Sequence, residues 1–317
     1  MSEQFDKVQF VTIEDDQDAQ RIDNYLMRVL KGVPKSKIYR ILRKGEVRVN
    51  KKRVKPTYKI QVNDEIRIPP VKIEESSSNV PATSKISFIE EAILYEDDRL
   101  IIVNKPSGIA VHGGSGLNYG LIEALRALRP NAPYLELVHR LDRDTSGCIT
   151  IAKKRSALRH LHEQLRNNQM DKTYHALVAG KWPKKRHKVS AKLQKNQLQS
   201  GERMVFADDE GKPSETHYKT LETFDFSTLV EAKPITGRTH QIRVHCQYAG
   251  HSIANDSKYG NAEFDKEIKK LGCKRLFLHA KTLSFIHPKT EEQVIYEAPY
   301  DQALQNLVET LRLGRSY

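Results

Sequence analysis

The chain has 317 residues, of which 38% are hydrophobic and 29% are charged, and its formal net charge is +13. Taking roughly 150 residues per domain, this length predicts two domains, and the composition is that of a soluble globular protein. No apolar run approaches the roughly 18 residues that a membrane span needs, and residues 1–6 lack the pattern of a secretory signal. We therefore expect a cytoplasmic protein that does not bind a membrane.

Nearly all of the net positive charge lies in one segment. Residues 21–72 contain 16 Lys or Arg and four Asp or Glu, so the remaining residues are close to neutral. Each phosphate that a basic side chain neutralises releases counterions and adds affinity, which favours nucleic acid as the partner. An anionic membrane surface is the weaker alternative, because no basic amphipathic helix with a bulky aromatic face accompanies the charge.

The basic segment has the pattern of a small unit of helices and strands. Apolar residues at helical spacing predict a short helix over 21–30. Ser36 is expected to cap a second helix over 37–44, with its apolar side chains inward and its basic ones in water. Residues 47–50 and 64–68 alternate as strands do.

This pattern resembles the small RNA-binding module named after ribosomal protein S4, also called the alpha-L motif. The resemblance covers roughly residues 19–70 and is carried by residues 21–23, 36–42 and 45–50. It implies an RNA-binding domain over residues 19–72. The side chains expected to contact RNA there are Arg21, Ser36, Lys37, Arg40, Arg43, Lys44, Arg48, Lys51, Lys52 and Arg53.

Residues 73–87 predict a flexible linker, because they are poor in apolar residues and rich in Ser and Pro. The second domain then spans residues 88–317. It contains neither a Gly-x-Gly-x-x-Gly fingerprint nor a phosphate loop, so a nucleotide cofactor is not expected. The glycines at 113–116 are interpreted as a turn, since no Gly-Lys-Ser/Thr follows them.

The second domain is predicted to be an α+β domain rich in strands. Alternation and β-branched content predict strands, and apolar side chains on one face predict helices. The predicted strands are 100–103, 134–138, 148–152, 174–179, 217–224, 228–232, 276–285 and 293–298, and the predicted helices are 156–168 and 240–249.

The most informative segment is His-Arg-Leu-Asp-Arg-Asp-Thr-Ser-Gly at 139–147, a charged turn between two predicted strands. Functional residues concentrate on loops held by a rigid scaffold. A turn laced with structural ion pairs is an equally good interpretation of this segment alone. The sequence does not choose between Asp142 and Asp144 as the reactive carboxylate, and no serine or cysteine triad is apparent.

Two further motifs complete a recognisable set. Lys-Thr-Tyr stands at 172–174, and Gly-Arg-Thr-His-Gln-Ile-Arg stands at 237–243. With the charged turn, these motifs are similar to those of the RluA family of pseudouridine synthases, and the likeness covers nearly the whole chain. It implies a mixed, mainly antiparallel sheet, no cofactor and no metal, and an enzyme that isomerises uridine in RNA to pseudouridine.

Within that family, the likeness is greatest to members that modify large-subunit (23S) ribosomal RNA. The resemblance therefore implies ribosomal RNA as the partner, free or in assembling particles, and we expect a monomer. The uridines that are modified cannot be read from the sequence, because shape and single-stranded loops dominate RNA recognition.

The resemblance also assigns roles to single residues. It implies Asp142 as the essential carboxylate, acting either as a nucleophile or by removing a ribose proton, with Arg243 as its paired charge. Tyr174 is implied to pack on the uracil, although a core tyrosine is the ordinary interpretation of such a residue. Arg140 is expected to fill the space left by the flipped-out uridine, and Lys105 to contact phosphate.

Two other classes of function remain open at this point. One is a non-catalytic RNA-binding or assembly protein, in which replacement of the reactive carboxylate would matter little. The other is a metal-dependent RNA hydrolase, which would be sensitive to chelators. Against the second, His240 and His245 do not share a helical face, and Cys148, Cys246 and Cys273 have no zinc spacing.

Overall fold

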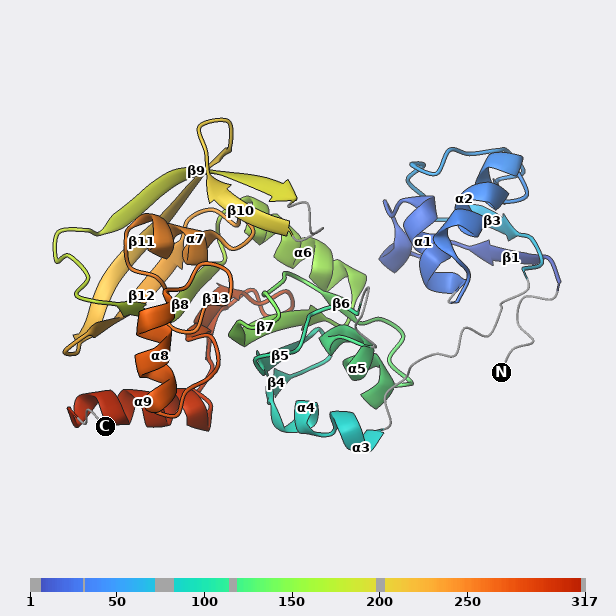
Figure 1. Cartoon of the computed structure of the whole chain (residues 1–317). Coiled ribbons are helices and arrows are strands. Elements are labelled where there is room, and N and C mark those ends of the chain that lie inside the picture. Colours follow the sequence, from blue (N-terminus) through green and yellow to red (C-terminus); the bar gives the residue numbers. More distant parts are fainter. Residues whose placement is uncertain (1–6, 31, 72–82, 114–118, 198–202, 315–317) are drawn as a thin grey trace. The chain divides into compact units, whose positions relative to one another are not determined.

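The structure is a computed structural model of the whole chain (Figure 1). It describes residues 7–30, 32–71, 83–113, 119–197 and 203–314. The chain divides into two compact units, Met1–Val80 and Pro81–Tyr317. Within the described ranges, no helix is both long and apolar enough to cross a membrane.

The N-terminal unit is a small sheet packed against two helices. Strand β3 lies between β1 and β2, and both pairings are antiparallel. The buried side chains of both helices and of the sheet form one core. Its elements are β1 (Gln9–Thr12), a 3-10 turn (Asp15–Gln17), α1 (Ile22–Val29), α2 (Lys35–Lys44), β2 (Arg48–Val49) and β3 (Glu65–Ile68).

Helix α2 begins earlier than its sequence suggested, so the expectation that Ser36 caps it is wrong. Pro34 occupies the N-cap, and its carbonyl accepts the N–H groups of Lys37 and Ile38. Ser36 therefore lies inside the first turn, where its side chain makes no capping bond. Gly45 ends the helix as expected, in the left-handed conformation (φ 70°) that glycine adopts without strain.

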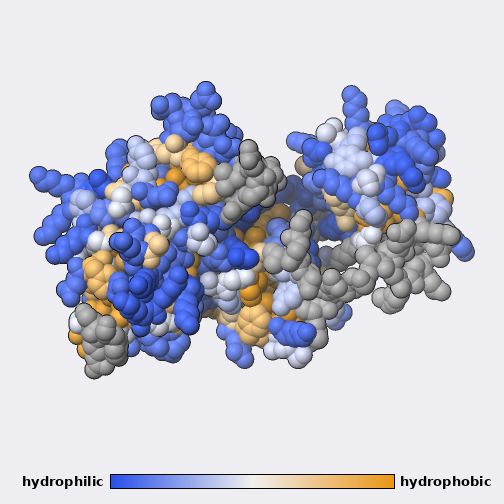
Figure 2. All heavy atoms as spheres, viewed as in Figure 1, coloured by the Kyte–Doolittle hydropathy of each residue, from blue (hydrophilic) through white to orange (hydrophobic). Residues whose placement is uncertain are grey.

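The basic side chains of this unit are directed to solvent. Figure 2 shows a largely hydrophilic face over these elements. Lys37 is half-buried, and Arg21 forms an ion pair with Asp23 at 2.6 Å. The side chains that are exposed are Arg21, Ser36, Arg40, Arg43, Lys44, Arg48, Lys51, Lys52 and Arg53.

The larger unit is built on one 11-stranded sheet, as the α+β prediction required. The order is β10-β9-β11-β12-β8-β13-β7-β5-β4, with β14 on β13 and β6 on β7. All pairings are antiparallel except that of β13 with β7. The strands are β4 (Ile93–Glu96), β5 (Leu100–Lys105), β6 (Glu136–Leu137), β7 (Ser146–Ala152), β8 (Asp171–Ala179), β9 (Lys188–Gln197), β10 (Arg203–Ala207), β11 (Lys212–Thr223), β12 (Ser227–Pro234), β13 (Leu278–Ile286) and β14 (Gln293–Glu297).

Helices cover both faces of this sheet (Figure 1). Alternate side chains of β5 point to opposite sides, so that Leu100 packs with α6 and Ile101 with α5. Helix α7 packs on β8, β11 and β12, while α8 and α9 share a separate core. The helices are α3 (Thr83–Ile86), α4 (Phe88–Glu91), α5 (Leu121–Leu128), α6 (Arg155–Arg166), α7 (Gln241–Tyr248), α8 (Ala262–Lys270) and α9 (Gln302–Arg312).

Two further expectations are corrected in this unit. Of the strand expected over 134–138, only Glu136–Leu137 pairs with β7. The segment expected as a linker at 73–87 includes helix α3, whose Ile86 is fully buried in the same core as α5. Residues 73–82 of that segment, and residues 114–116 of the expected glycine turn, lie outside the described residues.

Two buried histidines make the stability of this unit depend on pH. His245 is fully buried between Ser214 and Thr216, and His279 is 1% exposed. Burial lowers the pKa of each imidazole to about 4, from an ordinary value of 6.5. Between these pH values the unfolded chain binds a proton at each histidine and the folded chain does not.

The free energy of unfolding is therefore expected to fall as the pH is lowered from 6.5 towards 4. Each histidine contributes up to about 1.4 kcal/mol per pH unit, and this contribution is complete above the unfolded pKa. Urea unfolding at several pH values measures the slope. The double variant His245→Gln, His279→Gln should have a shallower slope, and an identical slope in both proteins would contradict the prediction.

Candidate active site

Asp142 lies in the turn between β6 and β7, and the sheet holds the end of this turn tightly. His279 and Ala280 of β13 pair in parallel with Ser146 and Gly147 of β7. Gly147 has a φ of 107°, and a Cβ there would meet the Ala280 carbonyl oxygen at 2.3 Å. The turn must therefore end in a glycine for the two strands to approach.

Hydrogen bonds from buried side chains fix the rest of the turn. The Ser146 hydroxyl contacts Nδ1 of His279 at 2.7 Å and accepts a hydrogen bond from Arg275 at 2.7 Å. The Thr145 N–H donates to the Asp142 carbonyl at 3.2 Å. These contacts hold the backbone around Asp142 in one conformation.

Lys105 also braces this turn, and the prediction that it contacts phosphate is corrected. Its side chain is fully buried, and Nζ donates to the carbonyls of Pro106, Ile109 and Arg143 at 2.8, 2.8 and 3.0 Å. Burial lowers the pKa of Lys105 to about 7, but three carbonyl acceptors match the three N–H groups of the ammonium form. Lys105 therefore serves the backbone next to Asp142 and does not face RNA.

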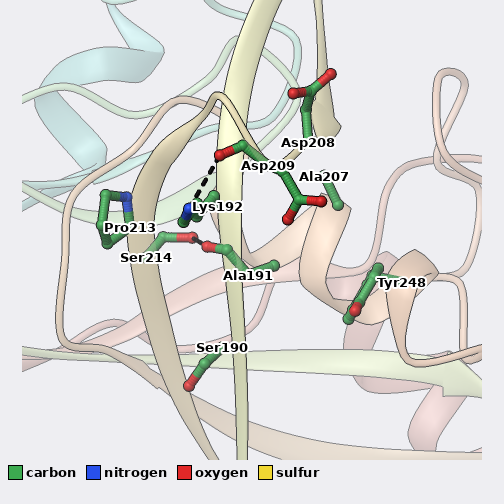
Figure 3. A pocket seen from close by; sticks show the side chains of 9 residues that line it. All are labelled: Ser190, Ala191, Lys192, Ala207, Asp208, Asp209, Pro213, Ser214 and Tyr248. Carbon is green, nitrogen blue, oxygen red and sulfur yellow. Dashed lines mark hydrogen bonds between the residues drawn. The ribbon is translucent and has the colours of Figure 1, made fainter.

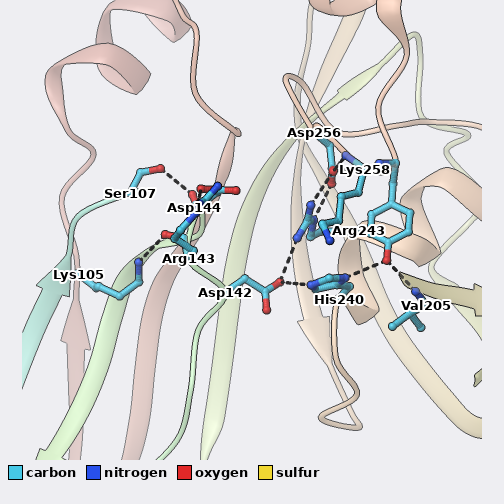
Figure 4. Close-up of polar contacts among 11 residues, drawn as sticks. Lys105, Ser107, Asp142, Arg143, Asp144, Val205, His240, Arg243, Asp256 and Lys258 are labelled. Carbon is cyan, nitrogen blue, oxygen red and sulfur yellow. Dashed lines mark hydrogen bonds and ion pairs between the residues drawn. The ribbon is translucent and has the colours of Figure 1, made fainter. Parts of the chain in front are cut away.

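The carboxylate of Asp142 faces Arg243 of α7, as Figure 4 shows. Nη1 of Arg243 donates to Oδ2 of Asp142 at 3.3 Å. The other edge of the guanidinium forms a bidentate pair with Asp256, with both contacts at 2.7 Å. The sequence motifs thus predicted the Asp142–Arg243 pair, but Asp256 was not foreseen.

Arg243 is ionised although it is buried. Burial alone would favour the neutral form, but the hydrogen bonds and charge of Asp256, and then of Asp142, raise the pKa of the guanidinium. Burial likewise opposes the charge of Asp256, and Arg243 more than offsets this and holds the pKa of that carboxyl below its usual value. The site therefore presents a fixed positive charge beside Asp142.

A cleft of about 290 Å³ opens in front of Asp142. Tyr174 of β8 and Arg140 of the turn line it together with Lys172 and residues 236–243. Burial, and then the negative charge of Asp142, raise the pKa of Tyr174, so its hydroxyl stays protonated at neutral pH. Arg140 is exposed at the same cleft. The three motifs found in the sequence therefore meet in one place.

Asp144 lies outside this cluster. Its carboxylate pairs with Arg143 at 3.1 Å, and its carbonyl accepts the Ser107 hydroxyl at 2.7 Å. Its contacts are those of a residue that shapes the turn.

His240 and Tyr259 are polar residues of the site whose roles the sequence did not indicate. Nε2 of His240 lies 3.7 Å from Oδ2 of Asp142, and Nδ1 lies 2.8 Å from the Tyr259 hydroxyl. Asp256 and Tyr259 stand in a loop after α7, without a helical or strand pattern that relates them to the motifs. Only the three-dimensional structure associates them with Asp142.

A larger hollow of about 710 Å³ lies between β9, β11 and the end of α7 (Figure 3). Two carboxylates, Asp208 and Asp209, face it, which makes it unsuitable for phosphate. Lys192 donates to the Asp209 carbonyl, and Ser214 donates to the Ala191 carbonyl. We assign no chemistry to this hollow, because it is separate from the cleft at Asp142.

In the part of the chain that the structure describes, no group of three or more His, Cys, Asp and Glu residues is placed to hold a metal ion. The three cysteines are free and buried. The ionisable side chains that line the cleft are instead one carboxylate and one phenol, those of Asp142 and Tyr174, together with the basic groups of His139, Arg140, Lys172, Arg238, His240 and Arg243.

Family models match both units of the chain. The model described as RNA pseudouridylate synthase matches residues 99–248, which include Asp142, Tyr174 and Arg243. The model described as S4 domain matches residues 20–66.

Several proteins are similar to this chain over nearly its full length. A ribosomal large subunit pseudouridine synthase C of Salmonella typhimurium is 59% identical over 96% of this chain and 97% of its own. The protein of the same name from Escherichia coli K12 is 58% identical over 97% and 98%. The structure of human RNA pseudouridylate synthase domain containing 4 superposes with a TM-score of 0.60 and 25% identity, covering 73% of this chain and 96% of that one.

Replacing Lys105 tests its role in bracing the turn. Lys105→Met removes a hydrogen-bond donor from three carbonyls, which is expected to lower the free energy of unfolding by about 1–3 kcal/mol. Catalysis should fall too, since Arg143, whose carbonyl keeps only the hydrogen bond from the Gly108 N–H, adjoins Asp142. Urea unfolding measures the first effect. Lys154→Met, at an exposed lysine beyond the other end of the β5–β7 pair, is the control. Equal stability of the two variants would contradict the bracing role.

Proposed function

Because the chain belongs to the RluA family of RNA pseudouridylate synthases, we propose that it isomerises specific uridines of large-subunit (23S) ribosomal RNA to pseudouridine, with Asp142 as the reactive carboxylate. The observation that carries the proposal is the meeting of Asp142 with a buried, ionised Arg243 in a cleft lined by Tyr174. The relatives that match nearly the whole chain are named as synthases of the large ribosomal subunit, which supports the substrate.

The geometry of the Asp142 carboxylate suits the reaction. Both neighbouring nitrogen atoms, Nη1 of Arg243 and Nε2 of His240, lie near the same oxygen, Oδ2. Among the contacts of the described residues, Oδ1 is the oxygen left for substrate. A carboxylate with one free oxygen serves both steps considered for it, attack on the ribose carbon and removal of a ribose proton.

Tyr174 and Arg140 are proposed to hold the base outside its helix. A stacked uridine reaches Asp142 only after it is flipped out, at a cost of a few kcal/mol. The Tyr174 ring in the cleft offers the uracil a stacking surface. The raised pKa of Tyr174 keeps its hydroxyl protonated, so the ring contributes more than the hydroxyl. Arg140 is exposed at the rim, where a guanidinium can stack and donate hydrogen bonds in place of the uridine.

The N-terminal unit is proposed to supply RNA affinity. Residues 19–72 form the RNA-binding domain in this proposal, residues 88–317 the catalytic domain, and the segment between them joins the two. The exposed basic side chains from Arg21 to Arg53 are its phosphate contacts. We further propose that the enzyme acts in the cytoplasm as a monomer, since a single chain supplies Asp142, Tyr174 and Arg243.

The variant Asp142→Asn tests whether the chain is an enzyme or a non-catalytic RNA-binding protein. The variant is expected to lose at least 1000-fold in turnover, as removal of a reacting group does, while its affinity for RNA stays close to that of the wild type. The measurement is tritium release from large-subunit ribosomal RNA labelled at the uracil 5-carbon. The control is Asp144→Asn, which should keep activity. Full release by Asp142→Asn would refute the proposal.

Neutralising α2 tests the RNA-binding surface. The triple variant Arg40→Gln, Arg43→Gln, Lys44→Gln is expected to bind RNA more weakly, with a shallower dependence on salt. The slope of log K against log salt should fall by about 0.7–0.9 for each phosphate that the variant no longer neutralises. Removal of three charges from α8, in Lys266→Gln, Lys269→Gln, Lys270→Gln, is the matched control. Equal slopes for the two triple variants would exclude α2 from RNA binding.

A further inference from the structure

His240 stands at the start of α7 in an uncommon conformation. Its φ of 53° and ψ of 18° place it in the left-handed region, which few residues other than glycine occupy without cost. Its side chain does not cap the helix. The preceding turn is instead held by Gln241, whose Oε1 accepts the Thr236 hydroxyl at 2.7 Å and the Arg238 N–H at 3.0 Å. The strained backbone serves to direct the His240 ring into the site.

The hydroxyl of Tyr259 determines which nitrogen of His240 carries the proton. This hydroxyl accepts the backbone N–H of Val205 in β10 at 3.0 Å, and Nδ1 of His240 lies 2.8 Å from it. Tyr259 is 1% exposed, so its own proton needs a partner within the protein. Nδ1 of His240 is that acceptor, which leaves the ring proton on Nε2.

The opposite end of the ring favours the same tautomer. Nε2 of His240 lies 3.7 Å from Oδ2 of Asp142. With the proton on Nδ1, the lone pair of Nε2 would face a carboxylate oxygen, and the Tyr259 proton would lose its acceptor. With the proton on Nε2, an N–H points to the carboxylate. The distance is longer than a hydrogen bond, as contacts in substrate-free sites often are, and shortens to one with a small shift of Asp142.

Burial favours the neutral form of the His240 imidazole. Burial lowers its pKa, and the positive charges of Arg243 and Lys258 act in the same direction, while Asp142 and Asp256 oppose them. A neutral donor orients the carboxylate without adding a second full positive charge beside it. Arg243 therefore remains the ionic partner of Asp142, and His240 is a directional one.

We propose that His240 and Tyr259 are positioning residues for uridine isomerisation, which hold Oδ2 of Asp142 through a path from the Val205 backbone and thereby direct Oδ1 to the substrate. The proposal rests on the proposed function, in which Asp142 is the reactive group. Figure 4 shows Asp142, His240 and Val205 along this path. Neither positioning residue needs to touch the uridine, because each acts through the carboxylate.

Tyr259→Phe isolates the hydroxyl. The ring stays under Arg243, whose Cζ lies 5.2 Å from the ring centroid, so packing is retained. We expect kcat to fall roughly tenfold, because a small misplacement of a reacting group is costly, and KM to stay within about twofold, because RNA binding is untouched. The control is Tyr218→Phe, which removes another buried hydroxyl, at 3.5 Å from Cys246, outside the cleft. Its kcat should be that of the wild type.

Variants of His240 test the direction of the contact. His240→Ala removes the donor and is expected to lower kcat at least as much as Tyr259→Phe. His240→Gln keeps an amide N–H of similar reach and should recover part of that loss. A Gln variant no more active than the Ala variant would indicate that His240 serves only the fold of its turn.

A double-mutant cycle decides whether the two residues act in series. In the His240→Ala background, Tyr259→Phe should cause no further loss of kcat, because the Tyr259 hydroxyl acts on Asp142 through His240 and that path is already cut. Two losses that multiply would show independent effects and overturn the path. Thermal unfolding of each variant identifies losses that arise from instability.

Asp142→Asn, assayed in parallel by tritium release, distinguishes a failure of the positioning role of His240 and Tyr259 from a failure of the catalytic role of Asp142. Activity that is lost in Asp142→Asn but unchanged in Tyr259→Phe and His240→Ala would overturn the positioning role alone. Activity that persists in Asp142→Asn would overturn the catalytic assignment, and the positioning role with it.

Discussion

The site depends on one buried guanidinium between two carboxylates. A buried charge is tolerated only when it is paired and hydrogen-bonded, and Arg243 meets this condition through Asp256, with two contacts of 2.7 Å. Asp142 accepts a single hydrogen bond from the same guanidinium, from Nη1 at 3.3 Å. Arg243 is therefore held in place by a buried residue that does not line the cleft, and the positive charge beside Asp142 is fixed before substrate binds.

The sheet is what makes this pair possible. Asp142 and Arg243 are 101 positions apart in the sequence. Asp142 is held by a turn whose end is locked between β7 and β13, and Arg243 by a helix packed on β8, β11 and β12. Strands of one sheet move little relative to one another, so the carboxylate and the guanidinium keep their spacing. Lys105 adds to this rigidity from inside the turn.

The sequence predicted the parts of the site that are carried by contiguous motifs. Asp142, Tyr174 and Arg243 were identified from three motifs, and the family these indicated was confirmed by relatives with up to 59% identity. Asp256 and Tyr259 were not foreseen, because their roles depend on a loop that returns to α7 only in the folded chain. The role of Lys105 was predicted wrongly, because the sequence shows that a lysine is charged but does not show that its side chain is buried.

The same limit applies to the fold. Period-two patterns located most strands of the larger sheet, since each has one or two buried faces. Strands β9 and β10 were not predicted, because this polar hairpin buries few side chains.

The distribution of charge, unlike these strands, can be read directly from the sequence. Residues 21–72 carry nearly all of the net positive charge of the chain. In the proposed function, affinity from phosphate contacts of these side chains is the same for bound substrate and transition state, so it would lower KM alone. Acceleration must then come from the second unit, where a small set of fixed dipoles and paired charges acts on one carboxylate.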